Sequence, residues 1–76
     1  MTTPETVIIG GREFEVWGWY ADASRSGRYA GRPRQFLGLH PKLPNLVRFA
    51  SPAGRTDRCS GWRWLRLAGE KLEMGA

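Results

Sequence analysis

Few side chains in this sequence are suited to covalent or acid-base chemistry. Cys59 is the only cysteine and His40 the only histidine among 76 residues. They would form a nucleophile and base only if both lay in one cleft with a third group orienting the histidine. Glu13 and Glu15 would share one face of a strand with carboxylates about 7 Å apart, a spacing that is equally common among ordinary surface charges.

Metal and nucleotide chemistry is also poorly supported. One cysteine and one histidine cannot supply the four ligands of a typical zinc site. Gly10-Gly11 lacks the lysine and the following helix of a phosphate-binding loop. We therefore expect a protein that is not an enzyme and that uses no cofactor or metal.

Positive charge is concentrated in the middle of the chain. Between Arg25 and Arg66, ten arginine and lysine side chains accompany one acid, Asp57, so this stretch carries +9 in a chain of net charge +5. Such a field attracts polyanions and acidic protein surfaces. The preference for arginine over lysine suits bidentate phosphate contact, although a GC-rich genome would also enrich arginine, glycine, alanine and proline together.

Two segments carry most of the candidate binding residues. Residues 21–34 have the composition of a long basic loop, which would reach along a phosphate backbone or remain a solvated surface loop. Residues 61–67 alternate tryptophan with arginine, and such rings either stack unpaired bases or fill the core of a small domain. The candidate nucleic-acid or partner-binding residues are Arg25, Arg28, Tyr29, Arg32, Arg34, Arg48, Arg55, Arg58, Trp62, Arg63 and Arg66, with Trp17 as a further stacking group.

Short apolar runs separated by turn residues predict the strands that position these side chains. Residues 6–9 and 12–17 form a predicted hairpin across Gly10-Gly11. Further strands are predicted at 35–39 and 46–50, with Val47 and Phe49 facing opposite to Leu46 and Arg48.

The second half of the chain is predicted in the same way. Residues 51–61 have the composition of a second exposed loop, which contains Cys59. Residues 61–67 are predicted to be a strand with one basic, aromatic face, and a helix is the competing interpretation. The remaining residues are predicted to complete a second hairpin.

These elements predict an all-β fold. We expect a single domain, 1–76, built as a small antiparallel barrel or roll of five to six short strands, either SH3-like or OB-like, with flexible ends at 1–5 and 75–76. A core this small is often completed by a second copy, so we also consider a homodimer. The sequence shows neither a signal segment nor an apolar run of about 18 residues, so we expect a cytoplasmic protein without membrane contact.

Two functions fit this sequence. The first is nucleic-acid binding, to DNA or RNA, with little sequence specificity, through the arginine-rich loop and the arginine and tryptophan face. The alternative is a small regulator or inhibitor that binds an acidic surface of a larger host protein, such as a polymerase or nuclease, through the same residues. The exposure of Trp62 and Trp64 matters for both, because burial of both rings would remove the stacking platform.

Overall fold

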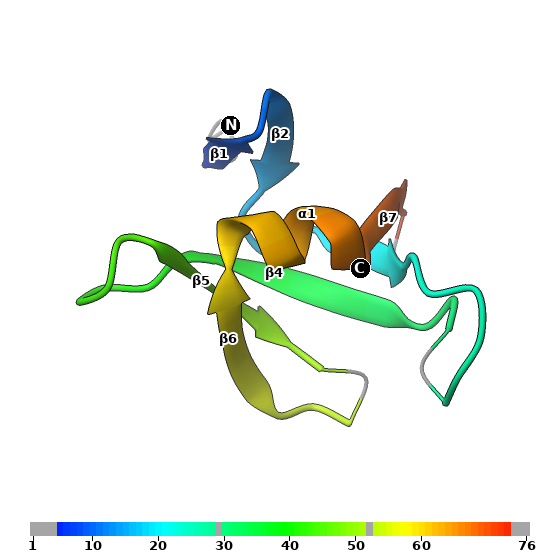
Figure 1. The fold of residues 1–76 in the computed structure, drawn as a ribbon. Helices are drawn as coiled ribbons and strands as arrows, with labels where there is room; N and C mark the ends of the chain where they lie inside the picture. Colours follow the sequence, from blue (N-terminus) through cyan, green and yellow to red (C-terminus); the bar gives the residue numbers. More distant parts are fainter. Residues whose placement is uncertain (1–4, 29, 52, 74–76) are drawn as a thin grey trace.

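In a computed structural model the chain forms two antiparallel sheets and one short helix (Figure 1). The structure describes residues 5–28, 30–51 and 53–73. One sheet is a hairpin of β1 (Thr6–Ile9) and β2 (Arg12–Glu15), and the other has the order β6-β5-β4-β3-β7. Its strands are β3 (Trp19–Asp22), β4 (Pro33–Leu39), β5 (Leu46–Ala50), β6 (Thr56–Ser60) and β7 (Ala68–Leu72), with α1 (Gly61–Leu67) between the last two. The fold is mostly sheet, as predicted, but the sheet does not close into a barrel, since β6 and β7 remain its two edges.

The predicted first hairpin is confirmed. Ile9 pairs directly with Arg12, so Gly10 and Gly11 form the two-residue turn. Both glycines have positive φ, 57° and 80°, which is the backbone region that a tight hairpin turn requires. The face containing Phe14 is buried and that of Glu13 is exposed, as the alternation predicted.

The second arm of this hairpin is shorter than predicted. β2 ends at Glu15, whose carbonyl accepts a hydrogen bond of 2.9 Å from the N–H of Gly18. The chain therefore turns through Val16 and Trp17, and Trp19 begins a further strand, β3, which was not predicted. A glycine-like φ of 72° at Trp17 makes this turn possible.

The core is a cluster of aromatic rings around Trp64. Its indole stacks with Phe36 and Phe49 at centroid distances of 5.3 and 5.4 Å, and it meets Phe14 and Tyr20 edge to face. All five rings are buried. The sequence left two roles open for the tryptophans, base stacking and core packing. Trp64 has the second role, because its ring fills the interior.

The strand predicted at 61–67 is wrong, because these residues form α1. Ser60 caps the helix, since its Oγ accepts a hydrogen bond of 3.1 Å from the N–H of Arg63. The helix turns Trp64 into the core and leaves Trp62 and Arg66 in solvent. The basic, aromatic face is therefore a helix face and not a strand face.

The loop predicted at 51–61 is also largely wrong. β6 occupies Thr56–Ser60 and pairs with the whole of β5, which leaves a turn closed by the N–H of Ser51 donating to the carbonyl of Arg55. Cys59 is buried in the core and is not a loop residue. The final strand, β7, pairs with β3 across the sheet and makes no hairpin with residues 61–67.

The predicted loop at 21–34 is shortened at both ends. Strands β3 and β4 take up 21–22 and 33–34, and the connection between them spans 23–32. Its base is closed by the N–H of Asp22 donating to the carbonyl of Arg32, at 2.8 Å. The predicted flexible ends, 1–5 and 75–76, lie outside the described residues except for Glu5, whose carbonyl accepts a hydrogen bond from the N–H of Val16.

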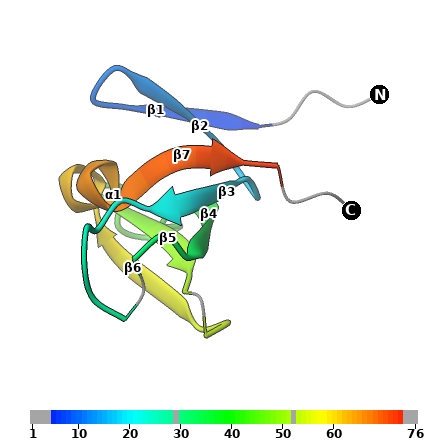
Figure 2. The ribbon, with the colours of Figure 1, turned by 90° about the vertical axis from the view of Figure 1, so that its right-hand side faces the viewer.

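The first hairpin covers one edge of the large sheet. Arg12 of β2 donates hydrogen bonds to the carbonyls of Ala68 and Gly69 in β7, and Lys71 forms an ion pair with Glu15. Figure 2 shows the hairpin lying beside β7, on the side of the molecule away from β6. The opposite edge, β6, carries the charged residues considered next.

Candidate functional site

Two arginines lie opposite each other on the outer face of the large sheet. Val47, Phe49 and Cys59 point into the core, so the alternating positions Arg48 of β5 and Arg58 of β6 point outward. The register makes Arg48 and Arg58 direct Cα partners. Like charges directly across a strand pair are destabilising, and within the described ranges neither arginine has an ion-pair partner. Their charge is therefore available to an anionic ligand.

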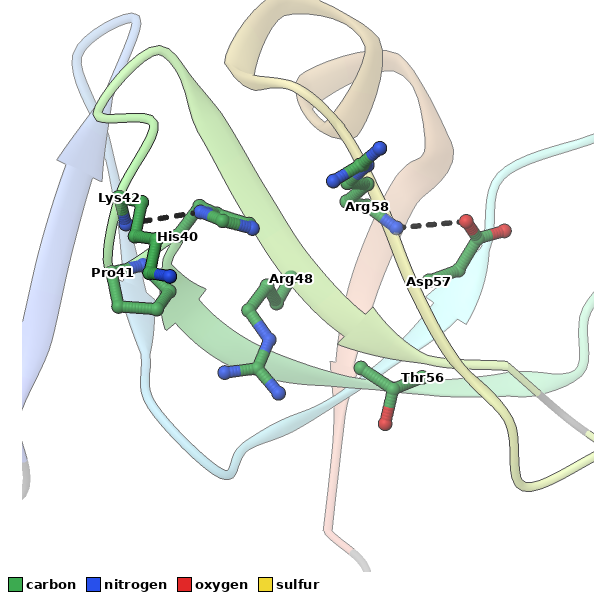
Figure 3. Close-up of a pocket in the computed structure, with 7 residues that line it drawn as sticks. All are labelled: His40, Pro41, Lys42, Arg48, Thr56, Asp57 and Arg58. Carbon is green, nitrogen blue, oxygen red and sulfur yellow. Dashed lines mark hydrogen bonds between the residues drawn. The ribbon is translucent and has the colours of Figure 1, made fainter.

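The connection between β4 and β5 adds a third cation to this pair. Nδ1 of His40 accepts hydrogen bonds from the backbone N–H groups of Lys42 and Leu43, both at 3.1 Å, which holds the turn that carries Lys42. Lys42, Arg48 and Arg58 line one groove of about 520 Å³, shown in Figure 3. His40 also lines this groove. Its Nδ1 stabilises the turn, because it already accepts hydrogen bonds from two backbone N–H groups.

Asp57 is the one acid in this groove, and it does not neutralise the arginine pair. Its Oδ1 accepts a hydrogen bond of 2.8 Å from the N–H of Arg58, and in Figure 3 its carboxylate points away from Arg48. β6 is an edge strand. A carboxylate held against an edge N–H places negative charge where another strand would pair. Asp57 therefore protects the edge of the sheet against strand addition.

A second groove, of about 410 Å³, lies between β6 and α1 and includes Arg58, Cys59 and Arg63 in its lining. Burial raises the pKa of the Cys59 thiol, and the nearby Arg63 guanidinium offsets this only in part. The thiol stays protonated at neutral pH and is a poor nucleophile. His40 lines the first groove and Cys59 the second, so the two residues do not form the dyad considered from the sequence.

Arg34 is placed differently from the other candidate arginines. Its Nε donates to Oδ2 of Asp22 at 2.8 Å, and the two side chains are only 12% and 1% exposed. Burial raises the pKa of Asp22, but hydrogen bonds from Ser24 and Arg34 outweigh it, and the net pKa lies below its usual value. The guanidinium also lies over the ring of Phe49, at 5.2 Å. This arginine anchors the base of the β3–β4 connection.

The exposed face of α1 carries the remaining members of the site. Trp62 is 74% exposed, whereas Trp64, two residues later, is fully buried. Arg66 follows Trp62 by one helical turn, and Arg63 is adjacent, so all three project from the solvent side of the helix. With Ser60 they line a third groove of about 370 Å³.

These three grooves form one continuous surface, because the first two share Arg58 and the last two share Arg63. We call six of its lining residues the β6 strip: Lys42, Arg48, Arg58, Trp62, Arg63 and Arg66. Arg34 also lines the second groove, and Asp57 lines the first two. Five of the six strip residues were candidates from the sequence. Lys42 was not, although its place in a turn between two predicted strands was a usable signal.

The other exposed candidates, Arg25, Arg28, Arg32 and Arg55, line none of the three grooves of the β6 strip. Arg25, Arg28 and Arg32 are exposed in the β3–β4 connection, at the far end of the seven-residue β4, roughly 20 Å from the β4–β5 connection. Arg55 is exposed in the turn between β5 and β6, and it lines a groove with Thr56 and Asp57, which also line the first groove of the strip. Tyr29 lies outside the described residues. The β3–β4 connection nevertheless meets the helix end of the strip, because the N–H of Ala23 donates to the carbonyl of Leu67 at 2.8 Å.

Trp17 is an exposed ring on another side of the molecule. Its side chain is 67% exposed and its φ is 72°, a conformation that costs a bulky residue about 1 kcal/mol or more. The N–H of Trp17 donates to the carbonyl of Phe36 at 2.7 Å, and its carbonyl accepts from Nε2 of Gln35 at 3.0 Å. The strained turn is thus held in place while the indole stays in solvent.

Within the described part of the chain, no three histidine, cysteine or acidic side chains gather as metal ligands. The only helix described has seven residues, too few to cross a lipid bilayer. Comparison with protein-family models, curated proteins and solved structures found no match to this chain.

Proposed function

We propose that this protein binds nucleic acid with little sequence specificity, through the β6 strip. The observation that carries the proposal is the direct pairing of Arg48 with Arg58 on the outer sheet face, with no acidic partner for either among the described residues. A phosphate backbone placed between them would replace repulsion with attraction. Release of condensed counterions from the nucleic acid would add to the affinity.

The composition of the strip favours a polyanion over a folded protein. Arginine is enriched at protein interfaces as well, but there it accompanies aromatic side chains in a core that is otherwise depleted in charged residues. The three grooves of the strip are lined by six lysine and arginine side chains against one acid, Asp57, so charge lies at the centre of this surface. Strand addition at this edge is also disfavoured by Asp57, which occupies the N–H of Arg58.

The strand order supports the SH3-like form of the expected fold over the OB-like form. Four consecutive strands, β3 to β6, form a meander, and β7 returns after a short helix to pair with β3. We propose that the large sheet is an open SH3-like roll in which α1 lies beside the gap between β6 and β7. Such a fold positions the strip but does not by itself assign a function.

The proposal is tested by titrating labelled single-stranded DNA, duplex DNA and RNA at about 50 mM and about 200 mM salt, following anisotropy. With five phosphate contacts, log affinity against log salt has a slope of about −3.5 for single strands. Arg48→Gln and Arg58→Gln each flatten the slope by about one contact. Arg25→Gln removes the same charge outside the strip, so it should change the slope less than Arg48→Gln or Arg58→Gln does. Absence of binding to all three ligands at low salt would reject the proposal.

Trp17 favours the second candidate function, a small regulator that docks on a larger protein. An exposed indole held by two backbone hydrogen bonds, at a φ that glycine would adopt more easily, is a suitable anchor for an apolar pocket. Figure 2 places the connection between β2 and β3 and helix α1 at opposite sides of the molecule. If the titrations fail, a search for protein partners becomes the next experiment, with Trp17→Ala as the variant expected to lose the partner.

A further inference from the structure

We propose that the β6 strip takes a single strand, and that one unpaired base stacks on Trp62. This inference rests on the proposed function and specifies its ligand. Trp62 lies at one end of the strip, where helix α1 presents its ring next to Arg63 and Arg66. The rest of the strip supplies phosphate contacts.

The helix gives Trp62 a fixed and accessible position. Ser60 caps the first turn through the N–H of Arg63, and Trp64 anchors the same helix in the core at zero exposure. The backbone beneath Trp62 is therefore held, while the residue remains 74% exposed. A base stacked on this indole would bring its neighbouring phosphates within reach of the two flanking guanidinium groups.

The path of the strip favours a flexible ligand over a rigid duplex. Lys42 and Arg48 belong to the outer sheet face, Arg58 lines the grooves on both sides of the edge strand, and Arg63 and Arg66 belong to the helix. The charges therefore follow the edge of the sheet round from one surface to another. Duplex DNA is stiff over about 150 base pairs and would touch only one of these surfaces at a time. A single strand can follow all three grooves.

The hydrogen-bonding chemistry of the strip predicts little preference among bases. Stacking on an indole accepts every base, since each has a π face, and arginines directed at phosphates carry no sequence information. In a molecule with extents of 32 × 29 × 25 Å, the site covers about four nucleotides, at the lower end of the range for small β domains.

The test compares a labelled single strand of about 12 nucleotides with the corresponding duplex, using the whole protein and the variants Trp62→Ala, Trp62→Phe and Trp17→Ala. The single strand is expected to bind about tenfold or more tightly than the duplex. Trp62→Ala should weaken single-strand binding about 5- to 100-fold with little change in salt slope, and Trp62→Phe should recover part of the loss. Trp17→Ala, which removes an equally exposed indole elsewhere, should change the affinity less than twofold. Circular dichroism verifies that each variant is folded.

The outcomes separate this inference from the proposed function. Equal affinity for single strand and duplex, or equal effects of Trp62→Ala and Trp17→Ala, would overturn the stacking inference while salt-dependent binding still supported the strip. An abasic single strand supplies a further comparison, because it should bind the unaltered protein and Trp62→Ala with the same affinity. A loss on Trp62→Ala that persists with the abasic strand would contradict stacking. Absence of binding to any nucleic acid would overturn both proposals.

Discussion

Replacing either arginine of the cross-strand pair should stabilise the fold while weakening ligand binding. Arg48 and Arg58 are direct partners, so their Cβ atoms lie about 5 Å apart and their flexible guanidinium groups can separate to about 8 Å. Two positive charges at that distance in water repel by about 0.5 kcal/mol, and salt reduces this further. Arg48→Gln removes the repulsion and keeps most of the side-chain stem. In a domain of this size the gain corresponds to a rise in Tm of about 2–4 °C at low salt.

A double-mutant cycle of thermal unfolding isolates this interaction. We expect Arg48→Gln and Arg58→Gln to stabilise the protein singly, and the second substitution to add less once the first is made. The gain should shrink when the salt concentration is raised toward about 1 M, where the Debye length is about 3 Å. Arg25→Gln, in the exposed β3–β4 connection, serves as the control for general loss of charge. Additive effects at low salt, or a lower Tm for both single variants, would show that Arg48 and Arg58 do not repel each other in the unliganded protein.

Three further predictions concern the elements that hold the strip in place. The lowered pKa of Asp22 means that its carboxylate, through hydrogen bonds from Ser24 and Arg34, contributes stability above about pH 4 that is lost as the pH falls through the folded-state pKa. Acid unfolding of Asp22→Asn should therefore be less steep in this range, and an identical acid transition would contradict the assignment. Arg12→Met should cost about 1–3 kcal/mol in urea unfolding, because two backbone carbonyls of β7 lose their donor, whereas a neutral result would show that water replaces it. Trp64→Ala should lower the free energy of unfolding by about 3–5 kcal/mol, which is comparable to the whole stability of a domain this small. Near-ultraviolet circular dichroism should then show the loss of fixed aromatic packing. A cooperative transition retained near the original Tm would contradict the central role of this ring.

The features that the sequence predicted correctly have strong local signals. Gly10-Gly11 is a turn dipeptide with a defined backbone conformation, and the hairpin around it follows. The alternation of Val47 and Phe49 against Arg48 predicted both β5 and the outward direction of its arginine. These assignments depend on neighbouring residues alone, which is why composition and periodicity were sufficient for them.

The features that were missed depend on contacts between distant segments. In a seven-residue element, the periods of a strand and a helix differ at only a few positions. A strand would place Trp62 and Trp64 on one face, whereas the helix buries Trp64 and exposes Trp62. The cap provided by Ser60 was the local signal for the helix, but it stands in a run of turn-forming residues. β6 has one buried side chain, Cys59, and an otherwise polar composition, so only its pairing with β5 makes it a strand.

Part of the candidate site was also beyond local reasoning. The pairing of Arg48 with Arg58 requires the register of two strands, one of which was expected to be a loop. The burial of Arg34 against Asp22 requires knowledge of where β3 and β4 meet. The sequence could identify which residue types were available for binding, whereas their division between the β6 strip and the β3–β4 connection depends on the tertiary fold.

The most direct test of the central claim is the salt dependence of single-strand binding for the unaltered protein and for Arg58→Gln. Arg58 lies at the centre of the β6 strip and lines both grooves beside the edge strand. We predict measurable binding at about 50 mM salt, a log–log slope of about −3.5, and a slope shallower by about 0.7 in the variant. An unchanged slope in Arg58→Gln, or no binding by the unaltered protein at that salt concentration, would contradict the assignment of the β6 strip as a nucleic-acid interface.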